Sequence, residues 1–237
     1  MEKGTLYMIP CPISDETTPW EVLPEANRSV MQQLDYFIVE NTRSARRFLS
    51  KAQLGLKIDT LEFVELNEHT VRGEAVEQMM APLEAGRSAG VISEAGVPGV
   101  ADPGALVVEA AHRRGIRVVP LVGPSSIILA VMASGLNGQS FAFNGYLPVK
   151  GGERQKAIRH FERRAHTEHQ SQLFIEAPYR NQKLVEELLQ TLQGETRLTI
   201  AMDLTSPTQY VRTQRVVDWR RTPLPDLQRR PAIFIIG

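Results

Sequence analysis

The sequence predicts an α/β protein of two α/β domains, with a mainly parallel sheet in the N-terminal domain and a mixed sheet in the C-terminal domain. Through the first half of the chain, short runs of β-branched and aromatic residues alternate with longer stretches of helical spacing. This alternation is typical of βαβ units and a parallel sheet. In the second half, two strand-like runs follow one another across a Ser-Pro turn, which indicates an antiparallel pair.

Each predicted strand is a short run rich in apolar and β-branched residues. In chain order these runs cover residues 5–9, 36–39, 88–93, 116–121, 141–143, 171–175, 197–202, 208–214 and 232–236. The stretches 43–54, 74–83 and 104–114 repeat apolar residues three and four positions apart, which predicts helices. Glycine and proline concentrate at residues 145–152. This change predicts an N-terminal domain over residues 1–145 and a C-terminal domain over residues 146–237.

Composition excludes several classes of protein. Of the 237 residues, 42% are hydrophobic and 23% are charged, as in globular chains and unlike disordered or collagen-like ones. The longest apolar run, residues 127–133, is too short to cross a bilayer. The one cysteine, Cys11, allows no disulfide within the chain, and the first residues lack the pattern of a secretory signal. We therefore expect a cytoplasmic protein.

The charges balance overall but are unevenly distributed. There are 27 basic and 27 acidic residues, and a net charge of zero argues against strong non-specific binding to nucleic acid. Bases outnumber acids within residues 41–51, 150–164 and 212–230. Solvated helix faces explain most such clusters. Three of them in a neutral protein are nevertheless compatible with an anionic substrate that binds locally.

Several common functional motifs are absent. The sequence has no Gly-x-x-x-x-Gly-Lys-Ser/Thr loop, no Gly-x-Gly-x-x-Gly after a strand and no Gly-x-Ser-x-Gly elbow. Nucleoside triphosphate hydrolysis, ordinary dinucleotide binding and serine hydrolase chemistry all lose support. Of the five histidines, which include His69, only His166 and His169 lie close in sequence, and their surroundings are polar. The sequence predicts no metal site.

Three loops follow predicted strands at the end of the sheet where open α/β proteins bind ligands. Residues 10–14 contain two prolines, residues 94–104 are rich in glycine and proline, and residues 122–126 open a helix with two serines. Turn formation alone explains any one of these loops. Three at matching positions favour a binding site. Their centres lack lysine and arginine, which argues against a polyphosphate and favours a ligand with a flat base, hydroxyls and a cationic centre.

These residues resemble a known family. Ser93-Glu94-Ala95-Gly96-Val97-Pro98, Ala101-Asp102-Pro103-Gly104 and the stretch 115–125 are similar to motifs of the tetrapyrrole-methylase superfamily of S-adenosylmethionine-dependent methyltransferases. Within it, the chain looks most like the members that methylate a cytidine ribose 2′-hydroxyl in small-subunit ribosomal RNA. The likeness covers almost the whole chain, from Gly4-Thr5-Leu6-Tyr7 through Glu176-Ala177-Pro178-Tyr179-Arg180 to the last strand.

The resemblance implies S-adenosylmethionine in a cleft between two α/β domains, and a homodimer. Backbone groups and small side chains would recognise the adenine and the amino-acid tail, and a carboxylate would offset the positive sulfonium. Carried over residue by residue, the resemblance assigns to the cofactor Pro10, Pro12, Ile13, Glu94, Gly96, Val97, Pro98, Ser125, Ser126, Glu176, Ala177, Met202 and Ala232.

The chain departs from the pattern of the ribosomal RNA members at several positions. Ser14-Asp15-Glu16 stands in place of Gly-Asn-Leu, Asn41 in place of aspartate, and Glu94 and Val97 in place of aspartate and threonine. Glutamate keeps the charge on a longer side chain, whereas valine loses a hydroxyl. Binding of the methyl donor is therefore better supported than the identity of the acceptor.

A ribose hydroxyl is a poor nucleophile, so a base that removes its proton would help methyl transfer. The candidate bases are Glu40, which directly follows a predicted strand, and Asp102, whose position also suits a turn. Arg43 is a candidate for holding a phosphate and orienting the base. The candidate contacts to RNA are Arg43, Arg47, Arg154 and Lys156.

Two alternatives stay open from the sequence. A tetrapyrrole carbon as the methyl acceptor calls for an apolar cleft and suits the basic stretches less well. A non-catalytic ligand-binding or ribosome-assembly protein on the same fold is compatible with the changes at residues 14–16 and at Asn41.

Overall fold

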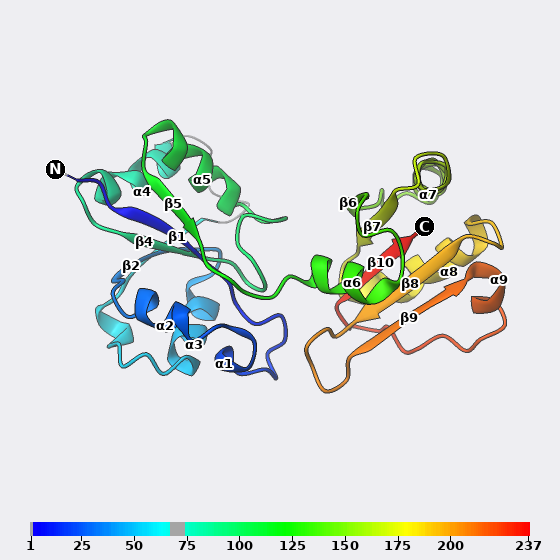
Figure 1. Ribbon diagram of the computed structural model, residues 1–237, viewed down its shortest axis with the longest axis horizontal. Coiled ribbons are helices and arrows are strands. Elements are labelled where there is room, and N and C mark those ends of the chain that lie inside the picture. The colour runs from blue at the N-terminus through cyan, green and yellow to red at the C-terminus, as the bar shows by residue number, and fades with distance from the viewer. Residues whose placement is uncertain (1, 67–73) are drawn as a thin grey trace. The chain divides into compact units, whose positions relative to one another are not determined.

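The computed structural model describes residues 2–66 and 74–237 and divides the chain into two compact units, Met1–Ser125 and Ser126–Gly237. Each unit contains one five-stranded sheet with helices on both faces (Figure 1). Two α/β units with one sheet each agree with the fold predicted from the sequence.

The sheet of the first unit is entirely parallel, with strand order β3-β2-β4-β1-β5. Parallel pairing requires a crossover between successive strands, and the helical stretches of the sequence supply these crossovers. The strands are β1 (Thr5–Ile9), β2 (Tyr36–Val39), β3 (Glu62–Glu65), β4 (Ala89–Ile92) and β5 (Arg117–Pro120).

Helices cover both faces of this sheet because successive strand residues point to opposite sides. Tyr36 and Ile38 pack into the core under α4 and α5, whereas Phe37 and Val39 pack into the core on the other face, with residues of α3. Figure 1 shows α4 and α5 above the sheet and α1, α2 and α3 below it. The helices are α1 (Pro19–Val22), α2 (Ala26–Met31), α3 (Thr42–Lys51), α4 (Glu74–Glu84) and α5 (Gly104–Arg113), with a 3-10 turn, η1, at Ile58–Thr60.

The sheet of the second unit is mixed, with strand order β6-β7-β10-β8-β9. Only β6 and β7 run parallel, and the other three pairs are antiparallel. This arrangement confirms the mixed sheet and the antiparallel pair predicted after the Ser-Pro turn. The strands are β6 (Phe141–Tyr146), β7 (Ser171–Ile175), β8 (Arg197–Met202), β9 (Tyr210–Arg215) and β10 (Ala232–Ile236).

Two cores flank this second sheet. Phe234 of β10 faces the core formed with α7, α8 and α9, and its neighbours Ile233 and Ile235 face the core under α6. The helices are α6 (Ser126–Ser134), α7 (Gly151–Thr167), α8 (Asn181–Thr191) and α9 (Val216–Trp219), with a 3-10 turn, η2, at Pro178–Arg180. No helix in the described ranges is both long and apolar enough to span a membrane.

The structure differs from the sequence prediction at the boundary between the units and at the edge strand β3. The division between the units falls at Ser125/Ser126 and not at 145/146. Gly145 lies inside β6 with a φ of +63°, and the register with β7 shifts between Phe143 and Tyr146. The glycine therefore marks an irregular strand, not a linker. Strand β3 was not predicted, since it begins and ends with glutamate, which an edge strand tolerates.

Candidate functional site

The carboxyl ends of β1, β4 and β5 are neighbours, because β1 pairs with β4 on one side and with β5 on the other. The chain leaves β1 toward β2 and leaves β4 in the opposite direction, toward β5. Open α/β sheets bind ligands where connections diverge in this way. The three loops singled out in the sequence all begin at this edge.

Backbone hydrogen bonds join the loops after β1 and β4. The N–H of Cys11 donates to the carbonyl of Gly96 at 2.8 Å, and the N–H of Gly96 donates to the carbonyl of Cys11 at 3.2 Å. Gly96 has a φ of +70°, which favours glycine. The reciprocal pair holds together the residues predicted to contact the cofactor in both loops, namely Pro10, Pro12, Ile13, Glu94, Gly96, Val97 and Pro98.

The loop after β5 packs against the loop after β1. A Cβ on Gly123 would lie 2.3 Å from Cγ of Pro10, so the Pro10 ring lies too close for any side chain there. Asn27 Nδ2 donates to the carbonyl of Val122 at 2.8 Å and fixes the loop from the other direction. Ser125 ends the first unit, and its side chain is half-buried. All three loops therefore form one rigid edge.

Two glutamates connect the ends of β2 and β4. Glu40 Oε2 accepts a hydrogen bond of 3.1 Å from the N–H of Glu94. The Glu94 side chain is exposed, and its Oε2 accepts from Ser44 Oγ at 3.3 Å. Two carboxylates therefore lie at the carboxyl edge of the sheet. Such a pair favours a positively charged group on a ligand.

Asp102 closes the turn before α5. Its Oδ1 accepts from the N–H of Gly104 at 2.7 Å, and both of its carboxylate oxygens lie 2.9 Å from the N–H of Gly99. Burial raises the pKa of Asp102, and the hydrogen bonds from Gly99 and Gly104 oppose this effect. The carboxylate is thus occupied by backbone donors, which favours the turn role over that of a base.

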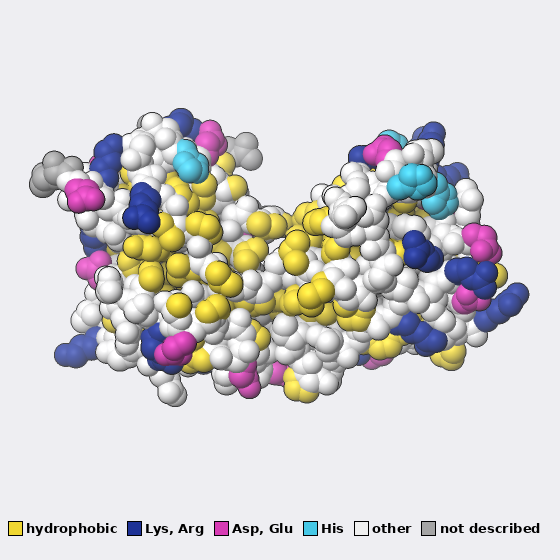
Figure 2. Space-filling view, viewed as in Figure 1, with side chains coloured by type: hydrophobic (Ala, Val, Ile, Leu, Met, Phe, Trp, Pro, Cys, Tyr) yellow, Lys and Arg dark blue, Asp and Glu magenta, His cyan; other side chains and the backbone are white. Residues whose placement is uncertain are grey.

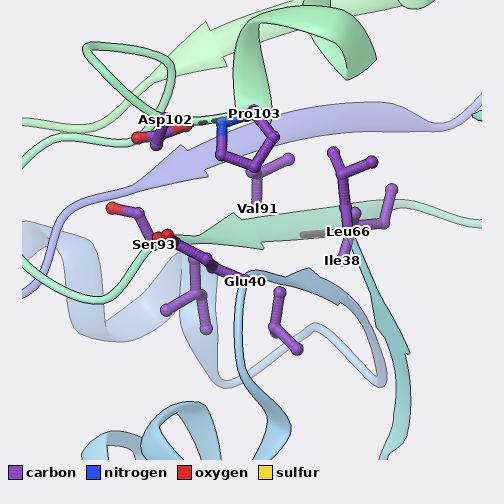
Figure 3. Close-up of a pocket in the computed structure, with 10 residues that line it drawn as sticks. Ile38, Glu40, Leu66, Val91, Ser93, Asp102 and Pro103 are labelled. Atoms are coloured by element: carbon purple, nitrogen blue, oxygen red, sulfur yellow. Dashed lines mark hydrogen bonds between the residues drawn. The ribbon is translucent and has the colours of Figure 1, made fainter. Parts of the chain in front are cut away.

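A small hollow lies between Glu40, Ser93 and Asp102 (Figure 3). Its volume is about 10 Å³, close to the minimum that one water molecule needs. Ile38, Leu66 and Val91 supply apolar lining. The hollow is far too small for a nucleoside. Its lining surrounds the Glu40 side chain with both polar and apolar residues.

Helix α3 begins two residues after Glu40. Asn41 accepts from the N–H of Ser44 at 3.1 Å and caps the helix. Arg43 is exposed and forms no ion pair with any of the residues at 2–66 and 74–237. Arg47 lies 3.3 Å from Asp15. The altered segment at residues 14–16 therefore engages one predicted RNA contact and leaves the other accessible.

In the second unit, the predicted residues also gather at one edge of the sheet. Met202 at the end of β8 pairs with Ala232 at the start of β10, and Glu176 and Ala177 follow the end of β7. Met202, Ala232 and Glu176 are buried, so mainly their backbone is available to a ligand. Ser126 is half-buried at the first position of α6.

Arg154 differs most from its predicted role. Its side chain is buried, and its Nη2 lies 3.2 Å from Glu176 Oε2 while its Nε donates to the carbonyl of Pro148 at 2.6 Å. A guanidinium held in this way cannot reach an RNA phosphate, which corrects the prediction for Arg154. Lys156, two residues later on α7, is exposed, and its contact with RNA stays a prediction.

Within residues 2–66 and 74–237, histidine, cysteine and carboxylate side chains nowhere form a group of three able to hold a metal ion. His69 lies outside the described residues. His166 Nε2 lies 3.2 Å from Thr196 Oγ1, which gives that histidine a partner within the fold.

Residues 20–218 match the family of Tetrapyrrole (Corrin/Porphyrin) Methylases. This chain belongs to that family. Two solved methyltransferases share the fold of this chain at low identity. The methyltransferase CobJ superposes with a TM-score of 0.63 at 14% identity, over 99% of this chain and 94% of CobJ. Uroporphyrin-III C-methyl transferase from Thermus thermophilus, complexed with S-adenyl homocysteine, superposes with a TM-score of 0.56 at 17% identity, over 99% and 97%.

Curated relatives of this protein are named ribosomal RNA methyltransferases. Ribosomal RNA small subunit methyltransferase I of Vibrio cholerae is 31% identical over 84% of this chain and 65% of that protein. The protein of the same name from Xylella fastidiosa is 31% identical over 98% of this chain and 80% of that protein. The chain thus spans slightly less than two thirds of the Vibrio relative.

Two polar residues at this edge of the first sheet were not predicted from the sequence. Ser44 donates to Glu94, and Glu65 Oε1 accepts from the N–H of Thr42 at 2.8 Å. The hydrogen bond from Thr42 lowers the pKa of Glu65. Ser44 offered a signal, since it stands in the first turn of a helix that follows a predicted strand. Glu65 offered none, because its strand was not recognised.

Proposed function

We propose that this protein is an S-adenosylmethionine-dependent methyltransferase that methylates a ribose 2′-hydroxyl of small-subunit ribosomal RNA. The observation that carries the proposal is the identity of 31% with the Xylella fastidiosa ribosomal RNA small subunit methyltransferase I over 98% of this chain. Membership of the family supports a methyl-transfer reaction. The likeness to solved tetrapyrrole enzymes is too low in identity to favour a tetrapyrrole acceptor.

The residues at the carboxyl edge of the first sheet fit the methyl donor chemically. S-adenosylmethionine supplies a methyl group on a positively charged sulfur. Glu94 and Glu40 provide negative charge at that edge, and Gly96 leaves the backbone open to close approach. Lysine and arginine are absent from the loops at residues 10–13, 94–98 and 122–125. A cationic ligand therefore meets no like charge from the loops themselves.

Glu40 is the residue we assign to proton removal from the acceptor hydroxyl. Its carboxylate lies at the end of a buried strand and is positioned by the N–H of Glu94. Arg43 stands three residues further along, in the first turn of α3, and carries a charge without an ion-pair partner among the described residues. A guanidinium in that state suits a phosphate of the acceptor strand. Asp102 is left with its role in the turn.

Arg43, Arg47 and Lys156 stay our candidates for contacts with RNA. All three are exposed, although Arg47 shares its charge with Asp15. A homodimer and a cytoplasmic location stay predictions from the sequence and the family resemblance.

Isothermal titration calorimetry of the purified chain with S-adenosylmethionine tests the proposal first. Methyl incorporation from radiolabelled donor into unmodified small-subunit RNA is then measured beside a tetrapyrrole precursor. Binding of the donor with methylation of the RNA is the expected result. Methylation of the precursor alone would assign a tetrapyrrole acceptor, and absence of donor binding would leave the non-catalytic function.

A further inference from the structure

Two exposed tyrosines stand at one edge of the second sheet. The chain contains eight Phe, five Tyr and two Trp, all of them in the described ranges. Among these residues only Tyr146 and Tyr179 are exposed, at 63% and 68% of their surface. Aromatic rings are among the side chains that folding most readily buries, so a pair left in water at the same place points to a partner.

The topology brings these rings to the same edge. Tyr146 is the last residue of β6, and Tyr179 lies in the turn η2 that follows β7. Because β6 and β7 are parallel neighbours, their carboxyl ends meet, and the register pairs Tyr146 with Ile175. Only a few residues separate Ile175 from Tyr179, so both rings belong to one surface.

Arg180 fixes the ring of Tyr179. Its guanidinium lies 5.1 Å from the centre of the Tyr179 ring, and Nη1 donates to the Tyr179 hydroxyl at 3.1 Å. The hydrogen bond to Glu176 raises the pKa of Arg180, and the Glu176 charge acts in the same direction. Glu176 is itself held by Arg154, so the surface is ordered before any partner arrives.

A row of unpaired cations begins beside this aromatic edge. Lys156, Arg159 and Arg163 follow each other at helical spacing on α7, are exposed, and form no ion pair with any other described residue. The first turn of α7 is held against the loop after β6 by the bond from Arg154 to Pro148. Figure 2 shows basic and histidine side chains gathered over the region that α7 occupies in Figure 1.

We propose that this surface binds a single-stranded segment of RNA, with bases stacked on Tyr146 and Tyr179 and phosphates on Lys156, Arg159 and Arg163. The row of cations extends about 10 Å along the helix, at about 1.5 Å per residue. Stacking on exposed rings needs unpaired bases, whereas a duplex offers mainly its phosphates to a protein. The inference rests on the proposed function, because RNA as the partner comes from the relatives.

Binding of a fluorescein-labelled, unstructured RNA of about twelve nucleotides, measured by anisotropy at several salt concentrations, tests this inference. Tyr146→Ala and Tyr179→Ala should each weaken binding about 5- to 100-fold and leave the salt dependence unchanged. Tyr146→Phe keeps the ring and should bind like the parent protein. A duplex of the same sequence should bind more weakly than the single strand and should not respond to the tyrosine changes.

The cations give a second, independent readout. Lys156→Gln, Arg159→Gln and Arg163→Gln should each lower the slope of log affinity against log salt by about 0.7. Lys183→Gln is the matched control, because Lys183 is an exposed lysine on α8 near Glu187 and should leave the slope unchanged. Circular dichroism of each variant checks that the fold persists, and Tyr146→Leu replaces Tyr146→Ala if the latter unfolds.

The outcomes separate this inference from the proposed function. Tyrosine variants that bind the single strand within twofold of the parent, or equal responses of duplex and single strand, would overturn the stacking surface. If those variants lose RNA binding but the parent protein transfers no methyl group, the stacking surface is supported and the proposed function is rejected. If the tyrosine changes leave methyl transfer unaffected, the proposed function is retained and the stacking surface is rejected.

Discussion

Arg154 and Glu176 form a buried ion pair in which Nη2 lies 3.2 Å from Oε2 and each side chain has no more than 2% of its surface exposed. The pair links the first turn of α7 to the loop that follows β7. The other oxygen, Oε1, accepts from Arg180 and from the N–H of Ala177. Burying a charged group in this way costs free energy unless its ion pair and hydrogen bonds are kept. The pair therefore fixes the loop that carries Tyr179.

Arg154→Met should lower the free energy of unfolding by about 3–5 kcal/mol, because it leaves Glu176 buried with one partner fewer. Urea denaturation followed by circular dichroism measures the change. Lys156→Met on the exposed side of the same helix is the control and should stay within about 0.5 kcal/mol of the parent. Equal effects of the two changes would show that the ion pair does not hold the loop.

Gly123→Ala should disturb the loops after β1 and β5 and weaken binding of S-adenosylmethionine about 10- to 100-fold. The added Cβ would lie 2.3 Å from Cγ of Pro10, whose ring cannot rotate away. Calorimetry with the donor gives the dissociation constant. Gly138→Ala is matched to it, since the nearest atom to that Cβ, on Val131, lies 3.6 Å away. Donor binding that is the same in both variants would contradict a donor site at this edge.

Glu40→Gln should reduce the rate of methyl transfer about 10²- to 10⁴-fold without changing affinity for the donor. The amide oxygen can still accept the hydrogen bond from the N–H of Glu94, so the loop keeps its position. Single-turnover transfer to unmodified small-subunit RNA measures the rate. Glu65→Gln, at the same edge, should leave it unchanged. A full rate in Glu40→Gln would reject Glu40 as the base.

Tyr36 should make the stability of the first unit sensitive to alkali. Burial raises the pKa of Tyr36 from 10.0 to about 12, and the Glu62 charge acts in the same direction while Arg87 opposes it. A raised pKa means that the folded state keeps the proton more tightly. The stabilisation is thus complete below pH 10 and is lost as pH rises toward 12.

The Tyr36→Phe variant makes this effect measurable. It loses the hydrogen bond of 3.2 Å from the hydroxyl to the carbonyl of Met79, worth about 1 kcal/mol near neutral pH. The deficit relative to the parent should shrink as pH rises, because the parent alone must release the Tyr36 proton on unfolding. Unfolding in urea across this pH range, with tyrosinate absorbance as the second probe, gives the difference. A constant deficit would contradict the raised pKa.

The strands of the first unit were largely predictable because each buried strand is a continuous apolar run. The strand at Tyr36–Val39 is apolar throughout, and so it is buried from both faces. Strand β3 escaped because Glu62 and Glu65 interrupt any such run. The pattern of a central parallel strand is visible in a sequence, whereas that of a short edge strand is not.

The candidate site was predictable as a set of loops but not as a set of contacts. Strand ends place residues 10–13 and 94–98 at one edge on topology alone. The direction of a single charged side chain depends on its helix face. Arg154 stands four residues before the buried Ile158 and eleven before the buried Ala165, so it shares their face, while Lys156 does not. The basic composition of the stretch concealed this difference.

The pairing of Cys11 with Gly96 has a practical consequence for experiments on the intact chain. The chain's one sulfhydryl is buried inside the segment that the donor is expected to touch, and its proton is held tightly. Maleimide dyes will therefore leave the native protein unlabelled and react as soon as that segment opens. Labelling of Cys11 thus reports local opening of this segment. Protection of Cys11 from labelling by added S-adenosylmethionine can be measured without introducing another cysteine.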